Sequence, residues 1–312
     1  MRITFAERPI YQAPLSVLEH LYYYTVQYGL SVRQFTGAHW RYWEWLPKRL
    51  SKAQNDPEGL KEIIAELDRF AAGSEERLQR RRAQIRKGKW EEKEIVLNAQ
   101  LLSVLAALPG ELLAIGFKKV IGCEGLPSRL QNVDLLIRGG KGEDTDFVEP
   151  GFLLLGDRHL LMIEVKTRGG AKSSRDYPPN QLLNYLQLVA KCHDSASSSL
   201  PNVFTHLILV PSTDPKWLEN HSEWVIETCD SSGRLRIDPD ACIRLSKKKA
   251  SYDYERLKNM AREIPIYYRS WQQLYEAFEF GIKQFDDKRN HWHWQKVGGE
   301  IKELATRAGM YK

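Results

Sequence analysis

An apolar segment that carries two opposite charges constrains the fold of this 312-residue chain more than any other feature. Residues 160–167 are apolar except for Glu164, Lys166 and Thr167, a composition typical of a buried strand. Side chains two positions apart on a strand point to the same face. The segment therefore predicts a strand that presents Glu164 and Lys166 side by side, with Ile163 and Val165 in the core behind them.

Segments on both sides of this strand have a clear structural character. Residues 132–137 read as another apolar strand with Asp134 near its start, and a helix opens near Gln181. The order of elements over residues 91–285 predicts an α/β fold, with a mixed central sheet and helices on both faces. The helices expected lie over 95–108, from 181 onward, over 250–263 and over 271–280. The strands expected lie over 112–123, 132–137, 160–167, 203–210, 224–229 and, at an edge, 264–268, with a further strand and tight turn over 152–159.

Composition narrows the class of protein. Hydrophobic residues make up 42% and charged residues 28% of the chain, as in ordinary globular proteins. The net charge of +6 is compatible with a polyanionic partner. The four cysteines show no Cys-x-x-Cys spacing, so neither a zinc site nor a disulfide framework is expected. With no signal peptide and no apolar membrane segment in the sequence, we expect a cytoplasmic protein without a membrane partner.

Residues 1–90 form an aromatic-rich region that we expect to be helical. The aromatic residues between 22 and 45 either stack on nucleic-acid bases or, as the more ordinary alternative, form the core of a small helical domain. Residues 77–89 hold seven basic residues and no acid, which suits either a phosphate-contacting helix or a solvated helix face. The candidate phosphate contacts are Arg81, Arg82, Arg86 and Lys87, with Lys172 and Arg175 in a later polar loop.

Carboxylates on neighbouring strands suit one kind of chemistry. Phosphodiester hydrolysis brings a hydroxide toward an anion and expels an alkoxide. Two carboxylates can hold Mg²⁺ or Mn²⁺, which polarises the phosphoryl group and acidifies bound water. A lysine on the same face can orient that water or stabilise negative charge. The alternative for Glu164 and Lys166 alone is a plain ion pair in a sheet.

Asp134, then Glu164-Val165-Lys166, then Gln181 with Tyr185 resembles the PD-(D/E)xK nuclease superfamily over about residues 91–285. The resemblance implies a restriction-endonuclease-like fold, with Asp134, Glu164 and the Val165 carbonyl as ligands of Mg²⁺ or Mn²⁺. It implies that Lys166 activates or positions the nucleophilic water and that Gln181 helps to orient Lys166 or the water from the helix. It also offers Glu94 on the preceding helix, with Glu91 and Glu92 beside it, as further candidates.

Along the sequence, Asp157 is nearer to Glu164 than Asp134 is. Asp157 lies in a Gly-Asp-Arg turn, however, where we expect it to have a structural role. Our leading hypothesis is a metal-dependent nuclease with DNA as its favoured substrate, in a setting such as genome defence or restriction. The alternatives are a non-catalytic nucleic-acid-binding or assembly subunit and a scaffold whose Glu164–Lys166 pair is structural. A partner protein or homo-oligomer is compatible with each. Residues 286–312 are expected to form a helical tail.

Overall fold

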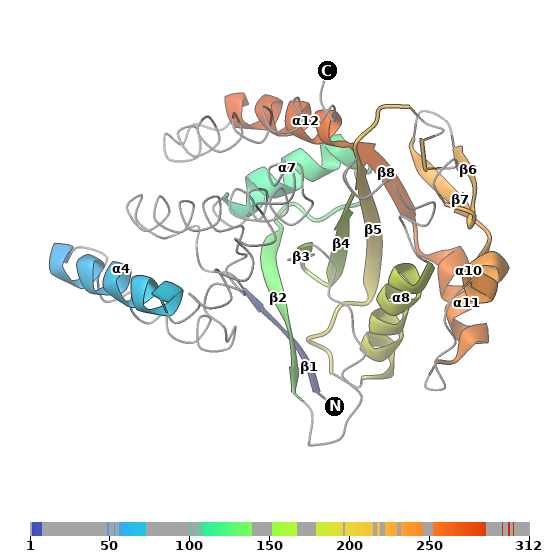
Figure 1. Ribbon diagram of the computed structural model, residues 1–312, viewed down its shortest axis with the longest axis horizontal. Helices are drawn as coiled ribbons and strands as arrows, with labels where there is room; N and C mark the ends of the chain where they lie inside the picture. Colours follow the sequence, from blue (N-terminus) through green and yellow to red (C-terminus); the bar gives the residue numbers. More distant parts are fainter. Residues whose placement is uncertain are drawn as a thin grey trace.

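The computed structural model describes residues 2–7, 56–72, 108–138, 152–166, 179–195, 197–214, 217–218, 222–229, 232–245 and 252–284, together with a few isolated positions. A mixed sheet of eight strands runs through these residues, and helices cover both of its faces (Figure 1). The prediction of an α/β fold with a mixed central sheet is confirmed. The predicted N-terminal aromatic residues 22–45, the basic stretch 77–89 and the tail 286–312 lie outside the described ranges or touch them only at single positions.

The sheet changes from antiparallel to parallel pairing at its centre. Its order is β1-β2-β3-β4-β5-β8-β7-β6. Strand β4 pairs with β5 in parallel and β5 pairs with β8 in parallel, whereas the remaining pairs are antiparallel. The strands are β1 (Arg2–Glu7), β2 (Gln131–Arg138), β3 (Phe152–Gly156), β4 (His159–Val165), β5 (Val203–Val210), β6 (Val225–Cys229), β7 (Arg234–Ile237) and β8 (Ile266–Ser270).

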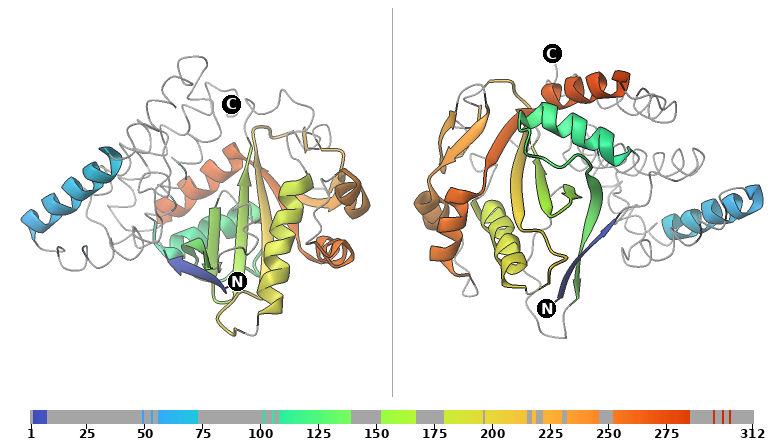
Figure 2. Two further views of the ribbon diagram at one scale, coloured as in Figure 1. Left: turned by 60° about the horizontal axis from the view of Figure 1, so that its bottom comes forward. Right: turned by 180° about the vertical axis from the view of Figure 1, so that it is seen from behind.

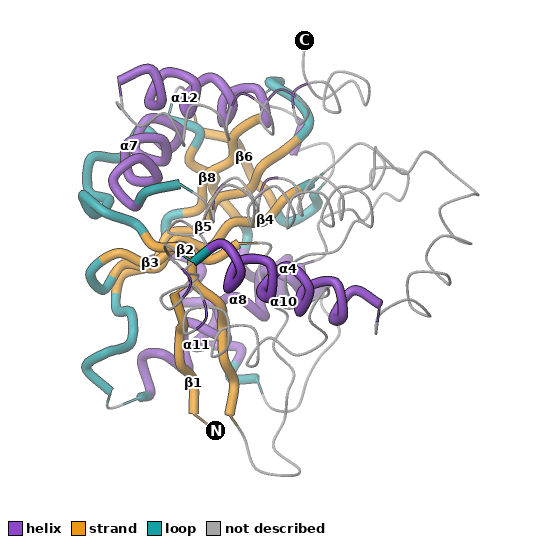
Figure 3. Tube along the Cα trace, turned by 90° about the vertical axis from the view of Figure 1, so that its left-hand side faces the viewer, coloured by secondary structure: helices purple, strands orange, loops and turns teal. Residues whose placement is uncertain are grey.

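Helices form a layer on each face of the sheet, as the side view in Figure 3 shows. Helices α7 (Gly110–Ile121) and α12 (Trp271–Gln284) pack on one face, which we call the α7 face. Helices α8 (Pro179–Asp194), α10 (Pro239–Leu245) and α11 (Tyr254–Glu263) pack on the other, the α8 face. Helix α4 (Pro57–Ala72) stands apart from both layers (Figure 2).

Helix α7 corrects the prediction of a strand over residues 112–123. Gly116, in the middle of this segment, allows two helices to approach closely. A Cβ built on Gly116 would lie 2.5 Å from Cζ of Phe278 on α12. The rings of Phe117 and Phe278 then meet edge to face, with centroids 5.2 Å apart. Gly122 ends the helix with φ of 72°, a conformation that glycine adopts without strain.

Three other features of the sheet differ from the sequence-based expectation. Strand β8 was predicted at an edge and over slightly earlier residues, yet it pairs with β5 on one side and β7 on the other. Strand β1 was not predicted, because the N-terminal region was expected to be helical. Strand β7 and helix α10 were not predicted either. The predicted strands near 132–137, 152–156, 160–167, 203–210 and 224–229, and the helices near 181, 250–263 and 271–280, are confirmed.

Arg269 fastens β8 to the end of α7 from inside the protein. Its side chain is buried, and its guanidinium donates to the carbonyl oxygens of Val120 and Ile121 in the last turn of α7. It also donates to the carbonyls of Ser232 and Tyr268. A cation at the carboxyl end of a helix interacts favourably with the helix dipole. Burial lowers the pKa of Arg269. Four backbone carbonyl oxygens accept hydrogen bonds from its guanidinium, and these bonds stabilise the charged form.

Strands β3 and β4 form a hairpin whose turn contains Asp157. Gly156 pairs with His159, and Asp157 has φ of 49°, in the left-handed region. A structural role for Asp157 at this turn agrees with the sequence-based expectation. Among the helices that the structure describes, none combines the length and the apolar character needed to cross a bilayer.

Candidate functional site

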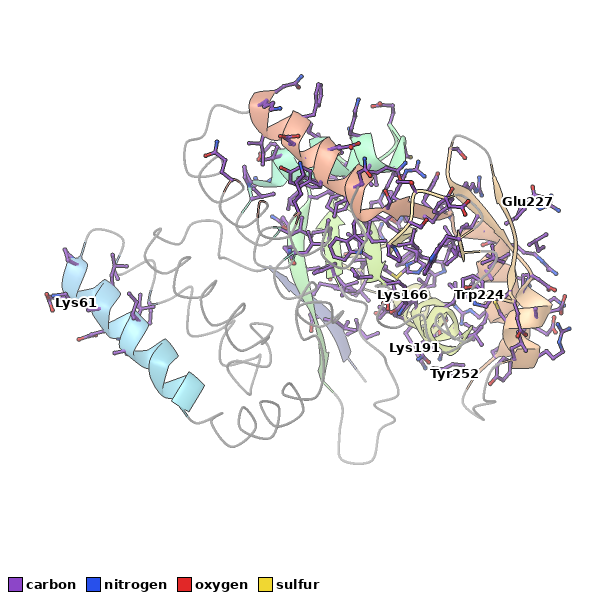
Figure 4. The ribbon with its side chains drawn as sticks, turned by 45° about the horizontal axis from the view of Figure 1, so that its top comes forward. Lys61, Lys166, Lys191, Trp224, Glu227 and Tyr252 are labelled. Carbon is purple, nitrogen blue, oxygen red and sulfur yellow. The ribbon has the colours of Figure 1, made fainter. Side chains whose placement is uncertain are left out.

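Glu164 and Lys166 lie together near the carboxyl end of β4, as the alternation of side chains predicted. The Lys166 ammonium donates to the Glu164 carboxylate, with Nζ 2.8 Å from Oε1. The two side chains are only 9% and 6% exposed. Figure 4 shows Lys166 beside α8. An ion pair so far from water is a costly feature unless other groups satisfy its remaining hydrogen-bonding capacity.

Helix α8 supplies one such group. The Tyr185 hydroxyl donates to Oε2 of Glu164, so both carboxylate oxygens accept a hydrogen bond. Tyr185 is fully buried, together with its neighbours Leu182, Leu186 and Val189 on the same side of the helix. These residues pack α8 on the sheet through the spacing that the sequence suggested. Tyr185 therefore fixes Glu164 from the helix while Lys166 fixes it from the strand.

The main chain of Lys166 is also held on two sides. Its N–H donates to the carbonyl of Leu209 on β5, over 2.8 Å. Its carbonyl accepts a hydrogen bond of 3.1 Å from the indole Nε1 of Trp271, the first residue of α12. A residue just past the end of a strand is often mobile, but these two bonds anchor Lys166 to both neighbouring elements. The Lys166 side chain therefore extends from a main-chain position that is hydrogen-bonded to both β5 and α12.

His206 on β5 is a member of the site that the sequence did not suggest. Its Nδ1 lies 3.1 Å from the carbonyl of Met162, and its ring meets that of Tyr185 edge to face with centroids 5.2 Å apart. Burial lowers the pKa of His206 to about 4, although the Glu164 carboxylate acts in the opposite direction. The imidazole is therefore neutral near pH 7, with Nδ1–H donating to Met162.

The strand register bears on the predicted partnership between Asp134 and Glu164. Val133 pairs with Leu153, and Leu153 pairs with Met162. Continued by one residue, this pairing places position 134 in the row in which Phe152 pairs with Ile163, which is the row next to that of Glu164. Adjacent rows of a sheet belong to opposite faces, so this register assigns position 134 to the α7 face and Glu164 to the α8 face.

A shared metal between Asp134 and Glu164 stays a prediction, because the Asp134 side chain is not among those that the structure describes. A local change of register in β2, such as a bulge, is a physical requirement for it. The sequence places Asp146 and Glu149 shortly before β3, although both lie outside the described residues.

The other predicted site residues divide by what the structure describes. Gln181 lies in the first turn of α8, as expected of a residue that opens this helix, but its side chain is not described. Val165 is buried on β4, opposite Leu209. The remaining candidates all lie outside the described residues, and they are Glu91, Glu92, Glu94, Arg81, Arg82, Arg86, Lys87, Lys172 and Arg175.

Divalent cations such as Mg²⁺ take several oxygen ligands in a near-octahedral arrangement. Within the described ranges, no group of three or more His, Cys, Asp or Glu side chains lies together in a way that could hold a metal ion. Glu164 is the one predicted carboxylate ligand whose side chain is described, and hydrogen bonds already occupy both of its oxygens. The described side chains thus supply one candidate metal ligand, and a metal centre would need a further carboxylate from outside this set.

Comparisons of the chain with family models, with curated protein sequences and with solved structures find no match. The buried Glu164–Lys166–Tyr185 cluster and its position in the sheet are the features of the chain that bear on its function.

Proposed function

We propose that this protein is a metal-dependent nuclease that hydrolyses phosphodiester bonds, with DNA as its favoured substrate. The observation that carries the proposal is the direct contact of Lys166 with Glu164 at the carboxyl end of β4, over 2.8 Å. Strands β4 and β5 are parallel there, and ligands of α/β sheets commonly bind beyond the carboxyl ends of parallel strands. A carboxylate and an ammonium in contact at this edge are the groups that phosphoryl chemistry uses.

Each residue of the cluster has a defined task under this proposal. Glu164 is a metal ligand, and Tyr185 and Lys166 orient its carboxylate through the bonds described above. The Lys166 ammonium stabilises negative charge on the phosphoryl oxygens or positions the attacking water, and Gln181 assists it from the helix. A bound Mg²⁺ or Mn²⁺ would polarise the phosphate and lower the pKa of bound water.

The second carboxylate is the part of the proposal most open to experiment. Asp134 is the candidate from the sequence motif, and Asp146 and Glu149 are competitors because they precede β3, which pairs with β4. Separate Asp134→Asn, Asp146→Asn and Glu149→Gln variants would identify the ligand. Loss of metal-dependent cleavage in one of them, with binding of nucleic acid retained, would assign it.

The test of the activity itself uses the full chain with a panel of single- and double-stranded DNA and RNA, in Mg²⁺, Mn²⁺ or EDTA. We expect cleavage with metal, none in EDTA, and none by Lys166→Ala. An Arg256→Ala variant is the matched control, because Arg256 makes an ion pair with Asp194 on the outer side of α8. Cleavage by Lys166→Ala at the parent rate would refute the assignment.

A second candidate function is a non-catalytic nucleic-acid-binding or assembly subunit. The specific observation in its favour is that both oxygens of Glu164 are already hydrogen-bonded in a site only 6% to 9% exposed. Such a cluster can serve the fold alone. Salt-dependent binding of DNA or RNA without turnover in any metal would favour this candidate over the nuclease.

A further inference from the structure

A hollow of about 380 Å³ opens at the far side of the sheet from β1, where β7, β8 and α11 diverge. Strand β7 pairs with β8 at one position only, Arg234 with Tyr267, whereas it pairs with β6 along its whole length. Figure 1 shows β7 set apart from β8 on the side of β6. Ala261 and Arg262, in the last turn of α11, complete the lining of the hollow. The hollow is thus a consequence of incomplete strand pairing.

Three arginines surround this hollow. Arg234 and Arg236 come from β7 and Arg262 from α11, and all are exposed. The Arg234 side chain makes no hydrogen bond or ion pair with any residue in the described part of the chain. Arg262 donates to the side-chain oxygen of Asn259 over 3.2 Å. The three guanidinium groups concentrate positive charge at the mouth of a small cavity.

Within the described residues, Arg236 is the one of the three arginines that forms an ion pair, and the charge of Arg262 also acts on the Asp240 carboxylate. Arg236 lies 3.4 Å from Glu227 on β6, and the two side chains are 64% and 51% exposed. Exposed ion pairs of this kind are weak and exchange readily for a better-placed anion. Figure 4 shows Glu227 on the outer strands, on the opposite side of α8 from α4 and well away from Lys166. The positive charge around the hollow is therefore available to a ligand.

The base of the hollow is aliphatic. Its apolar lining is made by side chains that are buried or half-buried, namely Leu235, Ile237, Ala261, Ile264 and Ile266. A cavity lined by apolar groups at its base and a few charged groups at its mouth selects a ligand with an apolar body and a charged end. An inorganic anion alone would leave the aliphatic lining unused.

We propose that this hollow binds a nucleoside phosphate, with the phosphate held by Arg234, Arg236 and Arg262 and the base lying on the aliphatic lining. Guanidinium groups match phosphate oxygens with paired hydrogen bonds. The volume suits a ligand of nucleotide size. A free nucleotide and the terminal nucleotide of a strand share this chemistry. The site lies three strands along the sheet from β4, so its existence does not depend on the proposed nuclease activity.

The experiment is equilibrium binding to the full chain by calorimetry in EDTA, which separates binding from any cleavage. The probes are adenosine 5′-monophosphate, adenosine, inorganic phosphate, and a short DNA strand with either a 5′-phosphate or a 5′-hydroxyl. We expect the nucleotide to bind more tightly than adenosine or phosphate. Paired Arg234→Gln and Arg262→Gln substitutions should weaken it at least about tenfold, because charge-assisted hydrogen bonds are lost.

Arg244→Gln is the matched control, since Arg244 is an exposed arginine on the neighbouring helix α10 and does not line the hollow. It should change the affinity by less than about twofold. Tighter binding of the 5′-phosphorylated strand than of both the 5′-hydroxyl strand and the nucleotide would identify a strand end as the ligand, and tighter binding of the nucleotide would identify a free nucleotide. Either order supports the site.

Four results would overturn the proposal. They are no binding of any phosphorylated probe at millimolar concentration, unchanged affinity in the Arg234→Gln, Arg262→Gln protein, an equal loss in Arg244→Gln, and equal affinity for phosphate and the nucleotide. Lys166→Ala should leave this binding intact. Failure of cleavage and failure of nucleotide binding are therefore separate outcomes.

Discussion

Replacing Lys166 by methionine tests whether the buried Glu164–Lys166 pair is a coupled unit. Methionine keeps most of the length of the side chain and removes the charge. The Glu164 carboxylate, only 6% exposed, would then keep its bond from Tyr185 and lose its counter-ion. Removing one partner of a buried ion pair costs about 3–5 kcal/mol, because the remaining charge is uncompensated. We expect a loss of that size in the free energy of unfolding.

Urea denaturation monitored by tryptophan fluorescence gives the measurement. For a large domain with m near 3 kcal/mol per molar, the midpoint should fall by more than about 1 M. The double variant Glu164→Gln, Lys166→Met removes both charges and keeps an acceptor for Tyr185, so it should be more stable than Lys166→Met alone. Lys283→Met is the control, because Lys283 and its partner Glu279 are 72% and 43% exposed. It should have a far smaller effect.

Two results would refute this reasoning. The first is a midpoint for Lys166→Met as close to the parent as that of Lys283→Met. The second is a double variant whose loss equals the sum of the two single losses, since independent sites give additive effects. Either would mean that the two buried charges do not stabilise one another.

Three further predictions concern the framework around the site. Arg269→Met should lower the free energy of unfolding by about 3 kcal/mol or more. Arg269→Lys should restore little of this stability, because an ammonium cannot reach four separate carbonyls. Thermal denaturation of both variants checks this prediction. Asp157→Gly should be more stable than Asp157→Ala by about 1 kcal/mol, since φ is 49° there, and equal melting temperatures would contradict it. The pKa of His206 falls from 6.5 in the unfolded chain to about 4 in the fold. The unfolded state therefore binds more protons between those values, and stability decreases as pH falls through that window. His206→Gln should flatten this part of a curve of stability against pH measured in EDTA, and an unchanged slope would contradict the lowered pKa of His206.

Features that depend on local periodicity could be read from the sequence. The alternation of β4 placed Glu164 and Lys166 on one face, and the structure brings them into contact. The spacing of Leu182 and Leu186 gave the buried side of α8, from which Tyr185 reaches Glu164. In each case a regular repeat within one element carries the information, and neighbours distant in sequence are not needed.

Features that depend on distant contacts could not be read in this way. The role of Gly116 could not be foreseen, because it depends on a close approach to Phe278, a residue about 160 positions further along the chain. His206 had no signal at all, being a lone histidine on an apolar strand. The internal position of β8 follows from its pairing with β7, a short strand with weak periodicity. Whether Asp134 joins Glu164 depends on strand register, which sequence patterning does not fix beyond one strand.

The proposed function assigns metal-dependent cleavage of phosphodiester bonds to the Glu164 cluster. The most direct measurement is the single-turnover cleavage rate of a labelled DNA strand in Mg²⁺ by the parent and by Glu164→Gln, which preserves size and an acceptor for Tyr185. The proposed mechanism predicts cleavage by the parent, loss of at least about a hundredfold in rate for Glu164→Gln, and unchanged binding of DNA by both proteins. Equal rates of cleavage by the two proteins would contradict it.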